Sequence, residues 1–232
     1  MPRKLFLFGA FFFFLTLYLV FNSPYFRLEN IEVTGNERVP ADEIRVLSGL
    51  IKGTSLLSLR PQVVAGRIKA NPWLEEVKIG FRWPATLRIE VREREPSAVV
   101  PLPQGQFLLI DSKGVALEVG KETGSLPVVT GGALRDFRLG EELTPVGYRW
   151  GAAVAEGLKT LRGDLSEVNV DSDQNITLYL RGGLPVFLGS ADASLGDRLE
   201  VLLSILADTK SRRSRLQYID LRFAGRPVVK ER

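Results

Sequence analysis

The residues that most often carry out chemistry in proteins are missing or scattered in this chain of 232 residues. It contains no cysteine and no histidine. Thiol catalysis, disulfides, cysteine- or imidazole-based metal sites and the Ser-His-Asp arrangement are therefore excluded. Glycine-rich nucleotide-binding loops and the Gly-x-Ser-x-Gly nucleophile motif are also absent from the sequence.

Paired carboxylates could still provide general acid and base catalysis, provided that both side chains share a cleft. The candidate pairs are Asp42-Glu43, Glu75-Glu76, Glu141-Glu142 and Asp171 with Asp173. Their neighbours indicate first turns of helices and ends of loops rather than a common cleft. The segment 171–173 could begin a calcium loop, but the later ligands and the glycine of such a loop are missing. The sequence thus predicts no catalytic residue, no cofactor and no metal site.

Positive charge does not gather strongly enough to indicate nucleic-acid binding. The 31 Lys and Arg against 27 Asp and Glu give a net charge of +4, and Arg3 with Lys4 contribute two of these charges. The densest basic cluster comprises Lys210, Arg212, Arg213 and Arg215. It follows a predicted helix that ends near Asp208, where the helix dipole favours cations. Contact with an acidic partner is the alternative role for this cluster.

The N-terminal segment predicts a membrane anchor. Residues 5–26 carry no charge, and the stretch 5–21 reads LFLFGAFFFFLTLYLVF. About 20 apolar residues are needed for a helix to span a bilayer, and we expect the transmembrane helix to cover residues 5–25. The basic residues of the preceding tail, 1–4, favour a cytoplasmic N-terminus. A cleaved signal peptide is the alternative, but residues 20–25 lack the small side chains of a cleavage site.

Residues 26–97 are predicted to form a small α+β domain in the order β-α-α-β-β. Its predicted elements are a strand at 31–33, helices at 40–49 and 61–70, and strands at 77–83 and 87–91. Apolar and charged residues alternate along the last two strands, which predicts an antiparallel hairpin with one apolar face. We expect Phe81 and Trp83 to face the core and to pack against Val64 and Ile68.

Residues 98–232 are predicted to form a mainly antiparallel β domain with flanking helices. Its predicted strands lie at 107–110, 115–119, 168–170, 176–180, 185–188, 218–223 and 228–229, and its helices at 144–161 and 192–208. Pro227 has no N–H to donate and is tolerated at the edge of a sheet. The chain-terminal strand, around residues 223–229, is therefore predicted to be an exposed edge, which invites the addition of a partner strand.

Several short motifs occur in the same order as in a known family. They are IEVTGN at 31–36, NPWLEEV at 71–77, RWPATL at 82–87, EREPSA at 93–98, LIDSKG at 109–114, LP at 126–127 and YIDLRF at 218–223. Together with the single apolar span, these motifs make the chain similar to the FtsQ/DivIB family of bacterial cell-division proteins. The resemblance covers nearly the whole sequence.

The resemblance implies an α+β fold with an N-terminal transmembrane helix, a POTRA-type domain at 26–97 and an FtsQ-type β domain at 98–232. It implies a non-enzymatic scaffold that recruits and holds FtsB/DivIC and FtsL at the division septum and helps to regulate septal wall synthesis. Other divisome membrane proteins are further expected partners. The implied location is the bacterial cell (inner) membrane, as a single-pass type II protein with extracytoplasmic C-terminal domains.

Partner binding in this family concentrates on the last strands of the β domain. Carried over by motif, it points to Tyr218, Asp220, Arg222, Phe223 and Gly225. We expect Phe223 to be the main side-chain anchor. Strand alternation, however, would put Phe223 on the same face as Ile219 and Leu221, which are expected in the core.

Two other functions stay open from the sequence. The first is another POTRA-bearing membrane assembly or translocation factor, although such factors usually carry several POTRA modules or a membrane β-barrel. The second is a membrane-anchored hydrolase that uses a carboxylate pair. Replacement of a single Asp or Glu would abolish the function of such a hydrolase.

Overall fold

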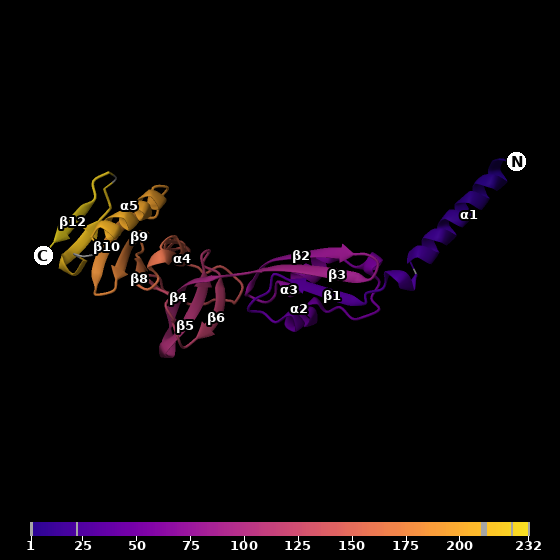
Figure 1. Ribbon diagram of the computed structural model, residues 1–232, viewed down its shortest axis with the longest axis horizontal. Helices are drawn as coiled ribbons and strands as arrows, with labels where there is room; N and C mark the ends of the chain where they lie inside the picture. The colour runs from indigo at the N-terminus through magenta and orange to yellow at the C-terminus, as the bar shows by residue number, and fades with distance from the viewer. Residues whose placement is uncertain (1, 22, 210–212, 224, 232) are drawn as a thin grey trace. The chain divides into compact units, whose positions relative to one another are not determined.

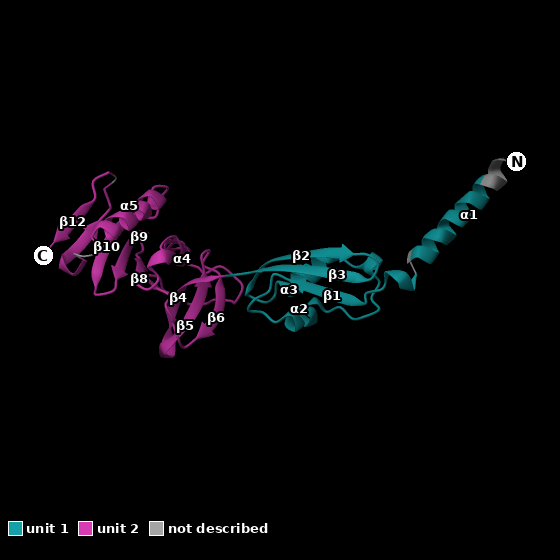
Figure 2. Cartoon of the chain, viewed as in Figure 1, with its two compact units in different colours: residues 1–94 teal, residues 95–232 magenta. Residues whose placement is uncertain are grey.

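The computed structural model describes residues 2–21, 23–209, 213–223 and 225–231. The chain divides into two compact units, residues 1–94 and residues 95–232 (Figure 2). Each unit has its own sheet, and the two are described separately.

The first unit begins with helix α1 (Pro2–Phe21), followed by the short 3-10 helix η1 (Pro24–Phe26). Most apolar side chains between residues 6 and 20 of α1 are exposed. Among the described residues, no helix combines the length and the apolar character that a membrane crossing demands. The transmembrane helix therefore stays a prediction.

The rest of the first unit is a three-stranded sheet with two helices, as far as the described residues go (Figure 1). Its elements are β1 (Asn30–Thr34), α2 (Ala41–Ser48), η2 (Leu56–Ser58), α3 (Pro61–Ile68), β2 (Leu74–Arg82) and β3 (Thr86–Glu93). The spatial order is β1-β3-β2, with β1 parallel and β2 antiparallel to β3. Ile44, Ile68, Leu87 and Ile89 are fully buried and form the core. The predicted β-α-α-β-β order is confirmed.

The predicted burial of two aromatic residues in this unit is wrong for Trp83 and only partly met by Phe81. Phe81 is only half-buried, and Trp83 lies beyond the end of β2 with 52% of its surface exposed. Their rings stack on each other, with centroids 5.3 Å apart. The reason is length: an eight-residue helix such as α3 is about 12 Å long, whereas the nine residues of β2 extend over roughly 30 Å. The apolar alternation continues past the part of the strand that the helices cover.

The second unit is built on one large mixed sheet. Its strands are β4 (Pro96–Leu102), β5 (Gln106–Asp111), β6 (Ala116–Gly120), β7 (Val128–Thr130), β8 (Leu165–Val170), β9 (Asn175–Leu180), β10 (Leu184–Ser190), β11 (Leu216–Asp220) and β12 (Val228–Glu231). Among the described residues they lie in the order β12-β11-β10-β9-β8-β7-β4-β5-β6. The strands predicted at 168–170 and 176–180 correspond to β8 and β9, which pair in antiparallel fashion.

Three strand pairs of this sheet are parallel, which the expectation of a mainly antiparallel domain missed. They are β4 with β7, β7 with β8, and β10 with β11. Parallel neighbours need a crossover connection, and the two long crossovers contain the helices α4 (Gly147–Gly157) and α5 (Leu195–Asp208). The alternation of apolar residues reports which face of a strand is buried, but it does not report which strand lies beside it.

The helices α4 and α5 pack against the large sheet and enclose a core made mainly of alanine, valine, leucine and isoleucine side chains. Helix α4 lies against β4, β7 and β8, and α5 lies against β10 (Figure 1). The buried core between them includes Val129, Ala152, Val168, Leu178 and Leu202. Short 3-10 turns complete the unit: η3 (Pro103–Gly105), η4 (Lys159–Leu161) and η5 (Arg213–Arg215). The helix predicted at 144–161 is shorter at both ends, because it begins at Gly147 and its last residues form a separate 3-10 turn.

Candidate functional site

The candidate site lies where the large sheet ends at β12. Of the strands that the structure describes, β12 is the outermost at this end, and it pairs on its inner side with β11 in antiparallel fashion. The pairing sets Tyr218 opposite Lys230 and Asp220 opposite Val228. All the residues of β12 are exposed. Strand edges of this kind offer unpaired N–H and C=O groups along the side that faces away from the sheet.

The terminal strand occupies a different range from the one predicted. Strand β11 ends at Asp220, and the segment from 221 to 227 connects it to β12 (residue 224 lies outside the described part). Alternation therefore does not extend to Phe223, which is 64% exposed, while Ile219 and Leu221 are buried. The expected conflict over Phe223 is resolved, because Phe223 does not share the core face.

Asp220 and Arg222 form a bidentate ion pair beside this edge. The Arg222 Nε and Nη2 atoms donate to the Asp220 carboxylate at 3.0 and 2.6 Å, and the Arg222 backbone N–H donates to Asp220 Oδ1 at 3.0 Å. The hydrogen bond from the Arg222 side chain lowers the pKa of Asp220, against the opposing effect of burial. The same bond raises the pKa of Arg222. The charged form of both groups is thus fixed at neutral pH.

Aromatic rings surround this ion pair. The guanidinium of Arg222 lies 5.3 Å from the ring centroid of Phe187 and 6.0 Å from that of Phe223. The rings of Phe187 and Tyr218 meet edge to face at 6.1 Å. On β12, the Nζ atom of Lys230 lies 5.7 Å from the Tyr218 ring. We call these six residues the Arg222 cluster: Phe187, Tyr218, Asp220, Arg222, Phe223 and Lys230.

The structure brings four of the five predicted site residues into the Arg222 cluster. The fifth, Gly225, lies in the β11–β12 connection with a left-handed φ of 72°. Nothing lies within 4 Å of the position that a side chain would occupy there, so Gly225 serves the turn rather than a close contact. The sequence reasoning missed Phe187 and Lys230. The strand that carries Phe187 was recognised, but its parallel pairing with β11 was not.

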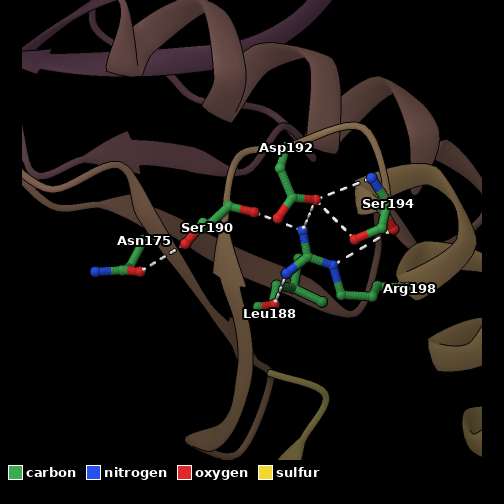
Figure 3. A network of polar contacts seen from close by, with 6 residues as sticks. All are labelled: Asn175, Leu188, Ser190, Asp192, Ser194 and Arg198. Carbon is green, nitrogen blue, oxygen red and sulfur yellow. Dashed lines mark hydrogen bonds and ion pairs between the residues drawn. The ribbon is translucent and has the colours of Figure 1, made fainter. Parts of the chain in front are cut away.

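A buried arginine holds the neighbouring strand in place. Arg198 on α5 is 8% exposed and donates to the carbonyl oxygens of Leu188 and Ser190 at the end of β10, the latter at 2.5 Å (Figure 3). It also pairs with Asp192 at 2.8 Å. The Ser194 hydroxyl and backbone N–H donate to Asp192 at 2.7 and 2.9 Å. These bonds from Ser194, followed by the charge of Arg198, lower the pKa of Asp192.

Gly189 connects this polar network to the Arg222 cluster. It lies at an irregularity in β10 and has a left-handed φ of 81°. A Cβ atom at this position would lie 3.2 Å from Arg198 Nη1 and 3.2 Å from Arg222 Cγ. Because glycine has no side chain, Arg198 and Arg222 both approach the backbone of β10 at this point. The position of Arg222 therefore depends on the same backbone segment that Arg198 holds.

Carboxylates of three of the four candidate pairs have structural partners, whereas Glu141 and Glu142 of the fourth line an open hollow. Asp42 pairs with Arg45 at 2.5 Å, and Glu75 and Glu76 both pair with Arg92. Within the described ranges, no three acidic side chains gather in a way that could hold a metal ion.

Asp171 closes the loop between β8 and β9. Its carboxylate accepts hydrogen bonds from the backbone N–H groups of Asp173 and Asn175, both at 2.9 Å. The bond from the Asn175 backbone is the main cause that lowers the pKa of Asp171. An aspartate that binds its own loop in this way is a turn residue.

The basic cluster that follows α5 is only partly described. Lys210 and Arg212 lie outside the described residues. Arg213 pairs with Asp164 at 2.8 Å, and Arg215 is exposed. This ion pair links the segment before β11 to the segment before β8.

Both units match known domain families. Residues 26–94 match the family described as "POTRA domain, FtsQ-type", and residues 98–222 match "Cell division protein FtsQ/DivIB, C-terminal". The chain is 33% identical over 220 residues to "Cell division protein FtsQ" of Geobacter sp. (strain M21), which covers 92% of this chain and 79% of that protein. It is 26% identical to "Cell division protein DivIB" of Clostridium botulinum (strain Hall), over 90% of this chain and 84% of that protein. On both the domain matches and the length of these alignments, the chain belongs to the FtsQ/DivIB family of cell-division proteins.

Proposed function

We propose that this protein is a non-enzymatic scaffold of the bacterial divisome. It recruits and holds FtsB/DivIC-type and FtsL-type proteins at the division septum and thereby helps to regulate septal wall synthesis. The observation that carries the proposal is the outermost position of β12 among the described strands, beside the Arg222 cluster, of which Arg222, Phe223 and Lys230 are exposed. Membership of a cell-division family supports the same function.

Strand addition is the binding mode that this edge favours. A partner segment in extended conformation pairs its backbone with the outer side of β12, and side-chain contacts then select the partner. Phe223 offers an exposed ring, and the half-buried Tyr218 on β11 lies against the ring of Phe187. The Asp220–Arg222 pair holds a guanidinium that can bind a carboxylate or a backbone carbonyl of the partner. Gly225 allows the turn that brings β12 back along β11.

The domain organisation that accompanies this function is also a proposal. Residues 1–4 form a cytoplasmic tail, residues 5–25 a transmembrane helix, residues 26–97 the POTRA-type domain and residues 98–232 the β domain. The protein is then a single-pass type II protein of the cell (inner) membrane, with other divisome membrane proteins as neighbours. The exposed apolar side chains of α1 support membrane insertion, because a row of phenylalanines in water is unfavourable.

Neither alternative function has a specific observation in its favour. A POTRA-bearing translocation factor would not account for the match of residues 98–222 to the C-terminal FtsQ/DivIB domain. A carboxylate hydrolase would need two available acids in one cleft. Asp171 is occupied by its own loop and Asp42 by Arg45. Glu141, which lines an open hollow with Glu142, lies 3.9 Å from the guanidinium of Arg138.

Replacement of Phe223 by alanine tests the proposal. The full chain in lipid nanodiscs is titrated calorimetrically with the extracytoplasmic domain of an FtsB/DivIC-type partner. A central aromatic anchor contributes about 2–4 kcal/mol to binding, which corresponds to a roughly 30- to 700-fold loss of affinity at about 1.4 kcal/mol per tenfold. Because Phe223 is 64% exposed, the melting temperature of the free protein should stay within about 2 °C of the wild type.

Tyr179→Ala is the matched control. Tyr179 is an exposed aromatic residue on β9 of the same sheet, three strands away from β12 and hence about 14 Å from it. Its replacement should leave the affinity unchanged. Equal affinity of Phe223→Ala and wild type would refute the anchor role, and an absence of binding by the wild type would refute the proposed partner.

A further inference from the structure

One end of the first unit carries aromatic and basic residues that the proposed function does not use. We call it the aromatic end: Tyr25, Phe26, Arg27, Ile51, Lys52, Phe81, Arg82 and Trp83. Neighbouring rings are in contact through the whole cluster. The ring centroids of Tyr25 and Phe26 are 5.4 Å apart, those of Phe26 and Trp83 are 5.6 Å apart, and those of Phe81 and Trp83 are 5.3 Å apart.

Backbone hydrogen bonds hold the three segments of the aromatic end side by side. The Leu28 N–H donates to the Thr54 oxygen, and the Gly53 N–H donates to the Leu28 oxygen, both at 2.8 Å. The Glu29 N–H donates to the Ala85 oxygen at 2.8 Å. Leu28 itself is fully buried beneath these bonds. The segment after η1, the loop after α2 and the β2–β3 turn therefore form one fixed surface.

Large apolar side chains on this surface face solvent. Tyr25 is 64% exposed, Ile51 is 75% exposed and Trp83 is 52% exposed. Packing against the unit's own core does not explain these values, because the core is complete beneath them with Leu28 and Leu87 fully buried. An exposed group of aromatic and aliphatic side chains marks an interaction surface.

The charged residues of the aromatic end are mainly basic. Arg27, Lys52 and Arg82 are exposed, and so is Glu29, an acidic residue next to the aromatic end in the sequence. Arg82 also pairs with Glu32 of β1 at 3.2 Å, which reduces its contribution. Aromatic rings combined with Lys and Arg are the chemistry of the membrane–water interface, where amphipathic rings lie at the headgroup level and cations meet anionic lipids.

The chain itself keeps this surface close to the membrane that would receive α1. Helix α1 ends at Phe21 and η1 begins at Pro24. Three residue steps extend over at most about 11 Å. A bilayer that contains α1 therefore lies within reach of Tyr25 and of the rings packed behind it. A protein partner has no comparable constraint that would bring it to this end of the unit.

We infer that the aromatic end of the first unit binds the headgroup region of an anionic membrane, with the Trp83 ring at the interface. The inference rests on the proposed membrane insertion of α1. Its consequence is mechanical: a second contact with the membrane, next to the anchor, restricts how the first unit can tilt on its short connection.

Tryptophan quenching by brominated lipids tests this inference. The full chain is reconstituted in vesicles of phosphatidylcholine and phosphatidylglycerol at 3:1, with bromine at a shallow acyl position. The described tryptophans besides Trp83 are Trp73, which is buried, and Trp150, which lies in the second unit. Wild type and the control Trp150→Phe should be quenched, and Trp83→Phe should lose this quenching. Lys52→Glu, or vesicles of phosphatidylcholine alone, should reduce the quenching of the wild type.

The possible outcomes separate the inference from the anchor. Carbonate extraction of the same vesicles reports whether α1 is inserted. Protein that resists carbonate but shows equal quenching in wild type and Trp83→Phe overturns the inference and leaves the anchor intact. Protein that is removed by carbonate contradicts insertion of α1, and the Trp83 signal recorded before extraction still decides whether the aromatic end binds lipid. If Trp83 is not quenched by the brominated lipid and its fluorescence changes only when a partner domain is added, the surface binds a protein and the inference is overturned.

Discussion

At the scale of single residues, the Asp220–Arg222 pair determines what the candidate edge presents to a partner. Asp220 is largely buried, while the side chain of Arg222 is about half exposed. Buried carboxylates are unfavourable unless they are hydrogen-bonded, and Arg222 supplies both side-chain and backbone donors. The pair thus fixes the guanidinium between the rings of Phe187 and Phe223.

Asp220→Asn should reduce stability in a pH-dependent manner. Arg222 lowers the pKa of Asp220 in the folded protein. The stabilisation is therefore fully present above the ordinary carboxyl pKa of about 3.9 and is lost as the pH falls through the lower folded value. We expect the variant to be roughly 1–2 kcal/mol less stable at pH 7, from the loss of charged hydrogen bonds. The difference from wild type should shrink as the pH falls below that ordinary carboxyl value.

Urea unfolding of the full chain at pH 7 and at pH 3 measures this difference. Asp173→Asn is a suitable control, because Asp173 is exposed in the β8–β9 loop and its replacement should change stability by less than about 0.5 kcal/mol. A gap between Asp220→Asn and wild type that widens in acid would contradict the assigned role of the ion pair.

At the scale of elements, close approach of α4 to the sheet depends on a glycine. A Cβ atom at Gly151 would lie 2.4 Å from Cγ1 of Val129, which is fully buried on β7. Gly66 in α3 is a helical glycine without such a neighbour, since nothing lies within 4 Å of its Cβ position. The two positions therefore separate steric crowding from helix propensity.

Gly151→Ala should destabilise the second unit, and Gly66→Ala should stabilise the first. Overpacking of a buried contact costs typically about 1–3 kcal/mol. In an open helical position, alanine is favoured over glycine by roughly 0.5–1 kcal/mol. Thermal unfolding of both variants measures the effects. Gly151→Ala with unchanged or raised stability would mean that α4 lies farther from β7 than the structure indicates.

The sequence predicted the helices and strands more accurately than it predicted which strands lie side by side in the sheet. Apolar alternation predicted β2 and β3, and the helix predicted at 40–49 corresponds to α2. Strand pairing could not be read in this way, because parallel β10 and β11 are separated by a whole helix. The exposure of Trp83 could not be predicted either. It depends on how far along β2 the helices reach, which only the three-dimensional structure shows.

The candidate site was predicted only in part, because the sequence did not show which strands lie next to β11. Its residues on β11 and the following connection came from one local motif, and the structure groups four of them. Phe187 and Lys230 come from two other strands, so no local pattern indicated them. Arg198 looks like any helical arginine in sequence, and only its contacts with the carbonyls of β10 show its structural role.

At the scale of the whole molecule, the chain combines an apolar N-terminal helix, a POTRA domain and a β domain with an exposed end strand. The family relationship covers both folded units. In the proposed scaffold, the two surfaces have different roles. The aromatic end of the first unit binds the membrane, and the β12 edge of the second unit binds the partner. Each surface can be altered without the other, because they belong to separate units.

Hydrogen exchange of the full chain, with and without the FtsB/DivIC-type extracytoplasmic domain, tests the central claim most directly. If a partner strand adds to the sheet, the amides of β12 (Val228–Glu231) that face away from β11 gain hydrogen bonds, and their exchange should slow by at least tenfold, or about 1.4 kcal/mol. Strand β6 (Ala116–Gly120) is the outermost described strand at the opposite end of the sheet and provides an internal control that should not change. Unchanged exchange at β12 in a saturated complex would contradict strand addition at this edge.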